Sequence, residues 1–179
     1  MNGVEAFARG LSAALAAASR AALFVSGAAL VAMTVVVAWG VFGRFVLNDT
    51  PAWAEASALL LLGWVILGAA AVGVREGFHM GFGSLRDALP APLARALDVV
   101  SDAVVTAFGA AMLWYGADLA WGVWDATLPT LGLPGAVEYA PLALGGLMIA
   151  LFGLERLVAH AVTGRAPEGL PEHAILTDA

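Results

Sequence analysis

Long apolar stretches alternate with short polar segments along the chain. Four stretches contain almost only apolar and small residues, at 21–43, 56–74, 99–117 and 139–154. A helix that crosses the roughly 30 Å hydrocarbon core of a bilayer needs about 20 such residues. The pattern therefore predicts an all-α integral membrane protein with four transmembrane helices. With their interfacial ends included, the predicted crossings are residues 21–43, 53–75, 97–119 and 138–160.

Composition supports a membrane protein. The chain has 179 residues, of which 61% are hydrophobic and 12% are charged, whereas soluble domains are about half apolar and a quarter charged. There is no cysteine, which excludes disulfides and thiolate metal sites. The acidic residues form no run and there is no basic patch, so we expect a lipid bilayer and no nucleic acid as a partner.

The arginines indicate the orientation. If the N-terminus is cytoplasmic, seven of the eight arginines are cytoplasmic and only Arg44 lies outside. Because cytoplasmic loops carry an excess of basic residues, we expect both termini in the cytoplasm. Residues 1–165 would then form one membrane domain, and residues 166–179 a flexible cytoplasmic tail. The same topology places an aromatic belt at the outer membrane interface: Trp39, Trp53, Trp114, Trp121 and Trp124.

Two segments outside the crossings have helical periodicity. Phe7, Leu11 and Leu15 recur every four residues, which fits either an interfacial amphipathic helix or an alanine-rich extension of the first crossing. Leu85 and Leu89 lie one turn apart before a proline break, which predicts a short interfacial helix.

Small residues at helical spacing predict close helix packing. The third crossing carries Ala103, Ala107 and Ala111 at four-residue intervals. The fourth crossing carries a similar strip made of Ala143, Gly146, Ala150 and Gly153. We expect another helix to pack closely on each strip.

The crossings offer little chemistry. None has an ionisable residue in its middle half, where ion-carrying helices normally place one, and none shows the paired, interrupted helices of transporters. We therefore expect a chain that translocates nothing by itself. Spacings such as HExxH are absent, so we expect no enzyme activity, no metal and no cofactor.

Two histidines leave a second hypothesis open, a membrane anchor of a redox or enzymatic complex. His79 and His160 both lie toward the predicted cytoplasmic side. A bis-histidine haem needs two imidazoles that face each other at one depth. His79 follows a glycine at a helix end and His160 lies at the membrane edge, so two interfacial histidines are the simpler interpretation.

The stretch at residues 44–79 has charged or polar groups at both ends of a membrane-length helix. At its start, Asp49 or Thr50 can cap the helix, with Pro51 in the first turn. At its end, Arg75 and His79 fit the negative end of the helix dipole, and Gly77 fits a left-handed cap.

Arg44 is the one arginine that this topology places outside. It could pair with Asp49, or with Glu55 one turn into the second crossing. Such an exposed intrachain pair would be worth little. The alternative is a contact between Arg44 and another membrane subunit, where partial burial would raise its importance.

The order of residues in this stretch resembles the small membrane subunit, the Q or DctQ-type component, of tripartite ATP-independent periplasmic (TRAP) transporters. The residues that carry the resemblance are Arg44, Phe45, Asn48, Pro51, Trp53, Glu55, Trp64, Gly68, Arg75, Glu76, Gly77 and His79.

The resemblance implies a division of labour. In that family a large membrane subunit carries substrate and sodium, and a soluble periplasmic protein delivers an organic anion, commonly a carboxylate. The small subunit packs beside the large one as a scaffold in the bacterial inner membrane. The residues expected to fix its fold or its contact with the large subunit are Arg44, Trp53, Glu55, Trp64, Arg75, Glu76, Gly77 and His79.

The connection between the third and fourth crossings, residues 118–138, is long and aromatic and has no basic residue. The resemblance implies that it faces the periplasmic binding protein. We therefore expect Trp121, Trp124 and Asp125 to help dock that protein.

Overall fold

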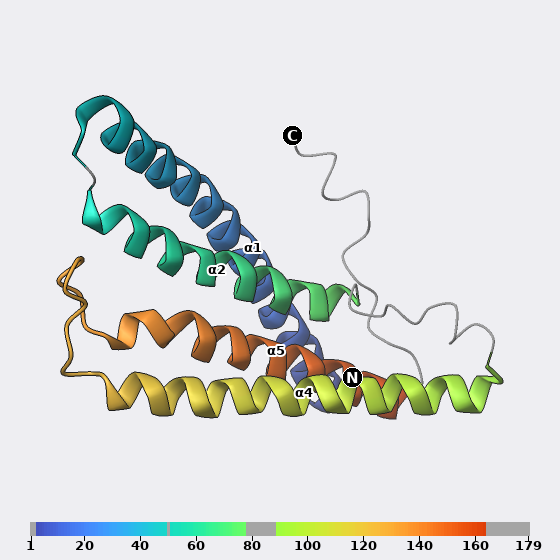
Figure 1. The fold of residues 1–179 in the computed structure, drawn as a ribbon. Helices are drawn as coiled ribbons and strands as arrows, with labels where there is room; N and C mark the ends of the chain where they lie inside the picture. Colours follow the sequence, from blue (N-terminus) through green and yellow to red (C-terminus); the bar gives the residue numbers. More distant parts are fainter. Residues whose placement is uncertain (1–2, 50, 78–88, 164–179) are drawn as a thin grey trace.

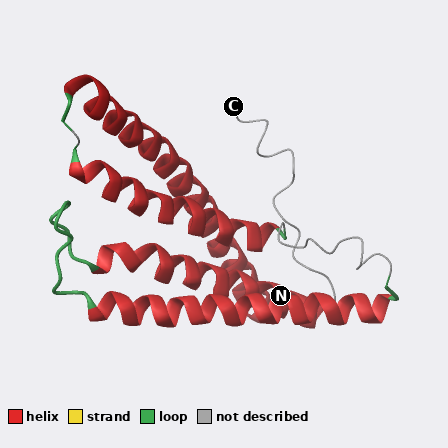
Figure 2. Ribbon diagram, in the orientation of Figure 1, coloured by secondary structure: helices red, strands yellow, loops and turns green. Residues whose placement is uncertain are grey.

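The structure is a computed structural model that describes residues 3–49, 51–77 and 89–163, and these residues are helical apart from their connections (Figure 1; Figure 2). The elements in order are α1 (Gly3–Phe42), the π-helix η1 (Gly43–Leu47), α2 (Ala52–Glu76), α4 (Ala91–Gly122) and α5 (Ala136–Thr163). The interfacial helix predicted around Leu85 and the C-terminal tail lie outside the described residues.

Four helical spans in the described part of the chain are long and apolar enough to cross a membrane: Ser12–Leu47, Ala52–Glu76, Pro92–Gly122 and Ala136–His160. The prediction of an all-α protein with four membrane-length helices is confirmed. Both interpretations of the N-terminal segment predicted helix, and residues from Gly3 onward belong to α1. At 1.5 Å per residue the 40 residues of α1 extend about 60 Å, twice the hydrocarbon thickness.

The helices form an open row in the order α1, α2, α5, α4 (Figure 1). Short connections make α1 and α2 antiparallel neighbours, and likewise α4 and α5. The two hairpins meet where α2 packs along α5, and α1 makes only slight contact with α5. Among the described residues no extensive contact joins α1 to α4, so the row does not close into a bundle.

Glycines on both helices allow the backbones of α4 and α5 to touch. A Cβ atom at Gly109 would lie 2.6 Å from the backbone nitrogen of Ala150, and one at Gly146 would lie 2.6 Å from that of Leu113. Such distances exclude any side chain, so these two positions require glycine. The predicted close-packing strip on the fourth crossing is confirmed, and its partner is α4.

The alanine strip predicted on the third crossing does not make this contact. Ala103, Ala107 and Ala111 are exposed on α4, on the side that helical periodicity places away from α5. The backbones approach more closely than a methyl group permits, so the contact falls on glycine positions instead. In the described residues no other helix packs on this strip.

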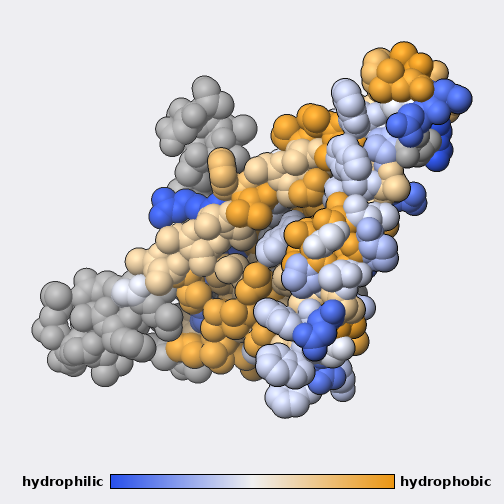
Figure 3. Space-filling model, turned by 90° about the vertical axis from the view of Figure 1, so that its left-hand side faces the viewer, coloured by the Kyte–Doolittle hydropathy of each residue, from blue (hydrophilic) through white to orange (hydrophobic). Residues whose placement is uncertain are grey.

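The buried core is small and centres on five apolar residues: Leu15, Ala71, Val74, Ile149 and Phe152. Most large apolar side chains are exposed, and Phe24 and Phe45 have 78% and 79% of their surface accessible. On the face that Figure 3 shows, hydrophobic side chains are widespread, and strongly hydrophilic ones are confined to small patches. A surface of this kind is stable in lipid and not in water.

Candidate functional site

The α1–α2 connection begins with the π-helix η1, and backbone hydrogen bonds to Gly43 hold the turn that follows it. The Asn48 and Asp49 backbone N–H groups both donate to the carbonyl of Gly43, and Asn48 has a left-handed backbone with φ 53°. A Cβ atom at Gly43 would lie 2.8 Å from the Asp49 carbonyl oxygen. Glycine is required at position 43 because the chain folds back directly over it.

Among the described residues, helix α2 begins without a side-chain cap: its N-cap is Pro51, which forms no side-chain cap hydrogen bond. The Pro51 carbonyl instead accepts from the Ala54 N–H at 3.0 Å. Asp49 therefore does not cap this helix, because the N-cap falls two residues later; the alternative cap, Thr50, lies outside the described residues and stays a prediction.

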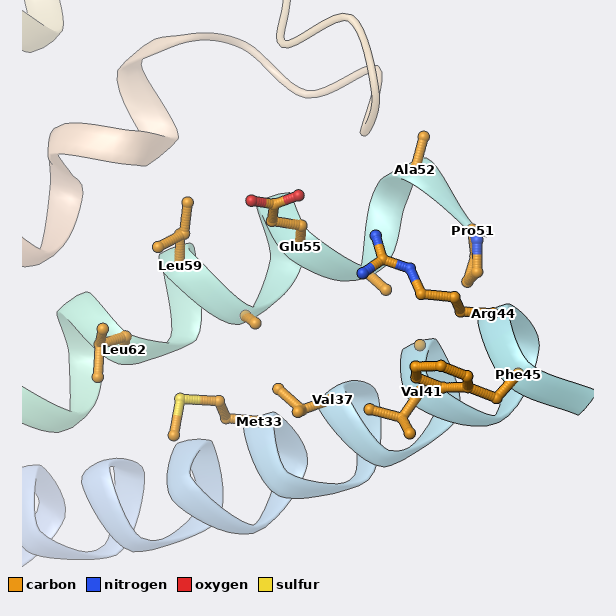
Figure 4. A pocket seen from close by; sticks show the side chains of 13 residues that line it. Met33, Val37, Val41, Arg44, Phe45, Pro51, Ala52, Glu55, Leu59 and Leu62 are labelled. Atoms are coloured by element: carbon orange, nitrogen blue, oxygen red, sulfur yellow. The ribbon is translucent and has the colours of Figure 1, made fainter. Parts of the chain in front are cut away.

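Arg44 extends from η1 into a cavity of about 370 Å³ between α1 and α2. Figure 4 shows its guanidinium and the Glu55 carboxylate among the side chains that line this cavity. Among the described residues Arg44 forms no ion pair within 4.0 Å with Asp49 or Glu55. The predicted intrachain pair is wrong, and both charged side chains are exposed.

The two tryptophans of the α2 motif lie in different surroundings. Trp53 is exposed in the first turn of α2, as an interfacial anchor would be. Trp64 is partly buried at the middle of the helix and lines a second cavity, of about 190 Å³, between α1, α2 and α5. Its carbonyl accepts a hydrogen bond from Ser26 Oγ at 3.2 Å, which ties α2 to α1.

At the other end of α2, Arg75 joins that helix to α5. Its Nε lies 3.5 Å from Glu155 Oε2, and its guanidinium carbon lies 5.9 Å from the centre of the Phe152 ring. Its Nη1 lies 4.0 Å from Glu76 Oε1. Only 14% of the Arg75 side chain is accessible. Arg75 therefore stabilises the contact between the α1–α2 helix pair and the α4–α5 helix pair.

Gly77 ends α2 as the sequence predicts. Its φ of 76° is left-handed, and its N–H reaches the carbonyls of Gly73 and Val74. This geometry satisfies carbonyl groups at the end of the helix. His79, two residues further on, lies outside the described residues.

A buried charge cluster that the sequence did not reveal lies between α4 and α5. Arg156 Nε donates to Asp102 Oδ1 at 2.9 Å, and His160 Nε2 lies 3.2 Å from Asp102 Oδ2. The Asp102 and Arg156 side chains are 2% and 3% exposed. His160, predicted only as an interfacial residue, therefore also faces a buried carboxylate of the neighbouring helix.

The spacing of these residues was a usable signal. Arg156 and His160 are four apart and share one face of α5, and Asp98 and Asp102 do the same on α4. Charges repeated on one face of a membrane helix are costly unless they pair with a neighbouring helix. Asp98 is also buried, at 5% exposure.

The α4–α5 connection is shorter than predicted. α4 continues to Gly122, so the connection comprises residues 123–135. It is a narrow hairpin in which the Leu128 N–H bonds to the Leu133 carbonyl at 2.8 Å, and the Gly135 N–H to that of Ala126 at 2.7 Å. Aligned backbone hydrogen bonds hold its two arms together.

Two aromatic rings project from the base of this hairpin. Trp121 and Trp124 have ring centres 6.5 Å apart, tilted by 38°. They are 81% and 62% exposed, and Asp125 beside them is exposed as well. The three residues predicted for docking are thus adjacent on the surface, at the same end of the molecule as the α1–α2 connection (Figure 1).

The buried charged side chains of the described residues serve contacts between helices. In the described residues no group of three histidine, cysteine or acidic side chains is placed to hold a metal ion. The buried Asp102 carboxylate lies within ion-pair distance of both Arg156 and His160, across the contact between α4 and α5. An open row of membrane-length helices held together in this way defines the class: a multi-pass membrane protein.

Comparison with known proteins identifies the family. Residues 33–163 match the family described as tripartite ATP-independent periplasmic transporters, DctQ component. Since this match covers most of the chain, the protein belongs to that family. It is a small permease subunit of a TRAP transporter, a transporter component and not an enzyme. The hypothesis of an anchor for a redox or enzymatic complex is therefore not supported.

Two relatives agree with this assignment. The chain is 24% identical over 172 residues to the C4-dicarboxylate TRAP transporter small permease protein DctQ of Vibrio cholerae, which covers 79% of this chain and 71% of the relative. It is 28% identical over 117 residues to the protein of the same name from Rhodobacter capsulatus. That match covers 64% of this chain and about half, 52%, of the relative.

Proposed function

We propose that this chain is the non-translocating scaffold subunit of a sodium-coupled TRAP transporter that imports an organic anion. It would pack against the large membrane subunit and help dock the periplasmic binding protein. Both relatives are named as parts of C4-dicarboxylate transporters, which supports a carboxylate as the substrate class.

The observation that carries the proposal is the open row of helices. A closed bundle buries its small-residue faces internally, whereas here the strip Ala103, Ala107 and Ala111 remains exposed on α4. Small residues at membrane-helix interfaces let backbones approach closely. The exposed side of α4 therefore suits a helix of the large subunit.

A role without translocation fits the placement of the charges. The buried pairs, Asp102 with Arg156 and Arg75 with Glu155, lie between packed helices. Each charged side chain in them faces a partner of opposite charge, so among the described residues neither pair offers an unpaired charged group to carry an ion. Sodium and substrate would then travel through the large subunit.

The motif residues divide between two tasks in this proposal. Within the chain, Trp64 and Arg75 would hold α2 against α1 and α5, and Glu76 and Gly77 would complete the C-terminal end of α2. Arg44, Trp53 and Glu55 remain exposed at the end that carries the aromatic hairpin, and would form the edge of the subunit interface. His79 is proposed as a part of the same motif on sequence grounds alone.

The arginine distribution supports an inner-membrane topology with both termini in the cytoplasm. The end of the molecule that carries η1 and the 123–135 hairpin would then face the periplasm. This orientation would present Trp121, Trp124 and Asp125 to the binding protein.

Co-purification from native membranes tests the scaffold role. We expect the tagged chain to recover a large multi-spanning partner, and Ala107→Trp to reduce that recovery because it fills the α4 strip. Ala32→Trp, at an exposed position of α1, is the matched control and should leave recovery unchanged. Failure of the unaltered chain to recover such a partner would contradict the scaffold role; equal loss in both variants would contradict the assigned face.

A further inference from the structure

The cavity between α1 and α2 is an elongated apolar groove next to the η1 turn. The side chains that wall it are Met33, Val37, Val41, Leu59 and Leu62 (Figure 4). Gly40 and Ala54 are part of its lining, and there a Cβ atom at Gly40 would meet Ala54 Cβ at 3.3 Å. Arg44 and Pro51 line the cavity on one side of this close approach, and Met33 and Leu62 line it on the other. Further along the two helices, Ser26 bonds to the Trp64 carbonyl at 3.2 Å.

A cation and an anion stand at one end of this apolar groove. Arg44 and Glu55 both line it, both are exposed, and among the described residues neither forms an ion pair. An arginine that reaches into an apolar cavity offers a planar set of donors suited to phosphate. A carboxylate on the same rim offers an acceptor for an ammonium group.

The length of the groove matches one leaflet of a bilayer. Trp39 and Trp53 lie near its charged end, and tryptophan rings prefer the level of the lipid headgroups. From Arg44 to Met33 the helix axis extends about 16 Å at 1.5 Å per residue. Half of a roughly 30 Å hydrocarbon core is about 15 Å. The charged end is therefore at headgroup depth when the apolar end is near the midplane.

We infer that this groove binds one phosphatidylethanolamine molecule from the leaflet that meets the α1–α2 connection. Its phosphate contacts the Arg44 guanidinium, its ammonium lies at the Glu55 carboxylate, and one acyl chain fills the space between Met33 and Leu62. The bound lipid completes the surface that α1 and α2 present to their surroundings, and it explains why the two charges stay apart.

Native mass spectrometry of the purified chain tests the inference. The delipidated protein is titrated with palmitoyl-oleoyl phosphatidylethanolamine, and separately with the matching phosphatidylglycerol. We expect Arg44→Gln to weaken binding of both lipids about tenfold, the effect of one lost charge-assisted hydrogen bond. Glu55→Gln should weaken only phosphatidylethanolamine, because phosphatidylglycerol has no ammonium group.

Two further variants separate a specific site from general lipid adhesion. Ala58→Phe fills the groove and should reduce binding of both lipids, since Ala58 lines it. Arg95→Gln removes an exposed arginine near the start of α4, far from the groove, and should change nothing. Each variant is first checked for unchanged helicity and elution volume.

Two results would overturn the inference. Equal lipid retention by Arg44→Gln and Arg95→Gln would mean that only non-specific lipid is held. The second result concerns the intact transporter complex. If Arg44→Gln lowers lipid retention in the isolated chain but not in the complex, the large subunit fills the groove in place of lipid.

Discussion

Arg156 donates from Nε to Asp102 Oδ1 over 2.9 Å, and this contact joins α5 to α4 in a region where both side chains are almost fully buried. Together with the close contacts at Gly109 and Gly146, this hydrogen bond fixes the rotation of α4 relative to α5. A buried charge pair is costly to form, yet it is far more costly to break on one side.

Asp102→Ala should lower the free energy of unfolding by about 3–5 kcal/mol, because it leaves Arg156 buried without its carboxylate. Thermal unfolding in detergent measures the loss. Asp118→Ala, at an exposed position of the same helix, should change the stability little. The double variant Asp102→Leu/Arg156→Met should lose less than the single one. Equal melting temperatures for Asp102→Ala and Asp118→Ala would contradict a stabilising role for the pair.

Gly109→Ala should destabilise the protein by about 1–3 kcal/mol through overpacking. Its Cβ atom would lie 2.6 Å from the Ala150 nitrogen, and backbone cannot move aside as a side chain can. Gly73→Ala is the matched control, since a Cβ there meets nothing within 4 Å. That control should gain about 0.5–1 kcal/mol from helix propensity, so the two variants should shift the melting temperature in opposite directions.

Gly77→Ala should cost about 1–2 kcal/mol, because a Cβ atom is strained at a φ of 76°. Gly77→Asn should cost less, since asparagine tolerates the left-handed conformation better. Both are measured by thermal unfolding. An alanine variant as stable as the asparagine variant would show that the end of α2 rearranges without cost.

Trp124→Ala should weaken docking of the periplasmic binding protein at least about tenfold, as expected for an exposed aromatic anchor at an interface. Asp125→Arg should weaken it as well. The measurement is the affinity of the reconstituted transporter for its binding protein, together with uptake. Trp114→Ala removes an exposed tryptophan that lies within α4 and should leave docking intact. Unchanged docking in both Trp124→Ala and Asp125→Arg would show that the hairpin at residues 123–135 is not part of the interface with the binding protein.

The orientation can be tested without background labelling, because the chain contains no cysteine. In intact cells, Asp125→Cys should react with a membrane-impermeant thiol reagent from the periplasmic side. Arg95→Cys should react only after the inner membrane is permeabilised. The reverse pattern would place both termini in the periplasm.

The hydrophobic pattern was sufficient to predict the four membrane-length helices, because the bilayer sets their length and composition. The Gly77 cap was also predictable, since a local conformation selects glycine there. The close contact of Gly109 with α5 was not predictable, because the alanine strip on the same helix gives an equally good periodic signal. Only the distance between two backbones distinguishes the strips.

The charged residues show a similar limit. Asp102 and Arg156 each lie near the end of an apolar stretch, a position equally compatible with headgroup exposure and with burial against another helix. The choice depends on a partner 54 residues away in the sequence. Arg44 is the opposite case, because the sequence suggested an ion pair that does not form. Asp49 and Glu55 are both near it in the sequence, but the η1 turn directs the guanidinium into the cavity.

The division of the row into two hairpins has a consequence for how the chain enters the membrane. The pair between Asp102 and Arg156 lies entirely within the second hairpin, so these charges can neutralise each other while α4 and α5 leave the insertion machinery together. The pair between Arg75 and Glu155 joins the first hairpin to the second. It can form only after both hairpins are in the bilayer, so Arg75 must remain near water until the last two helices arrive.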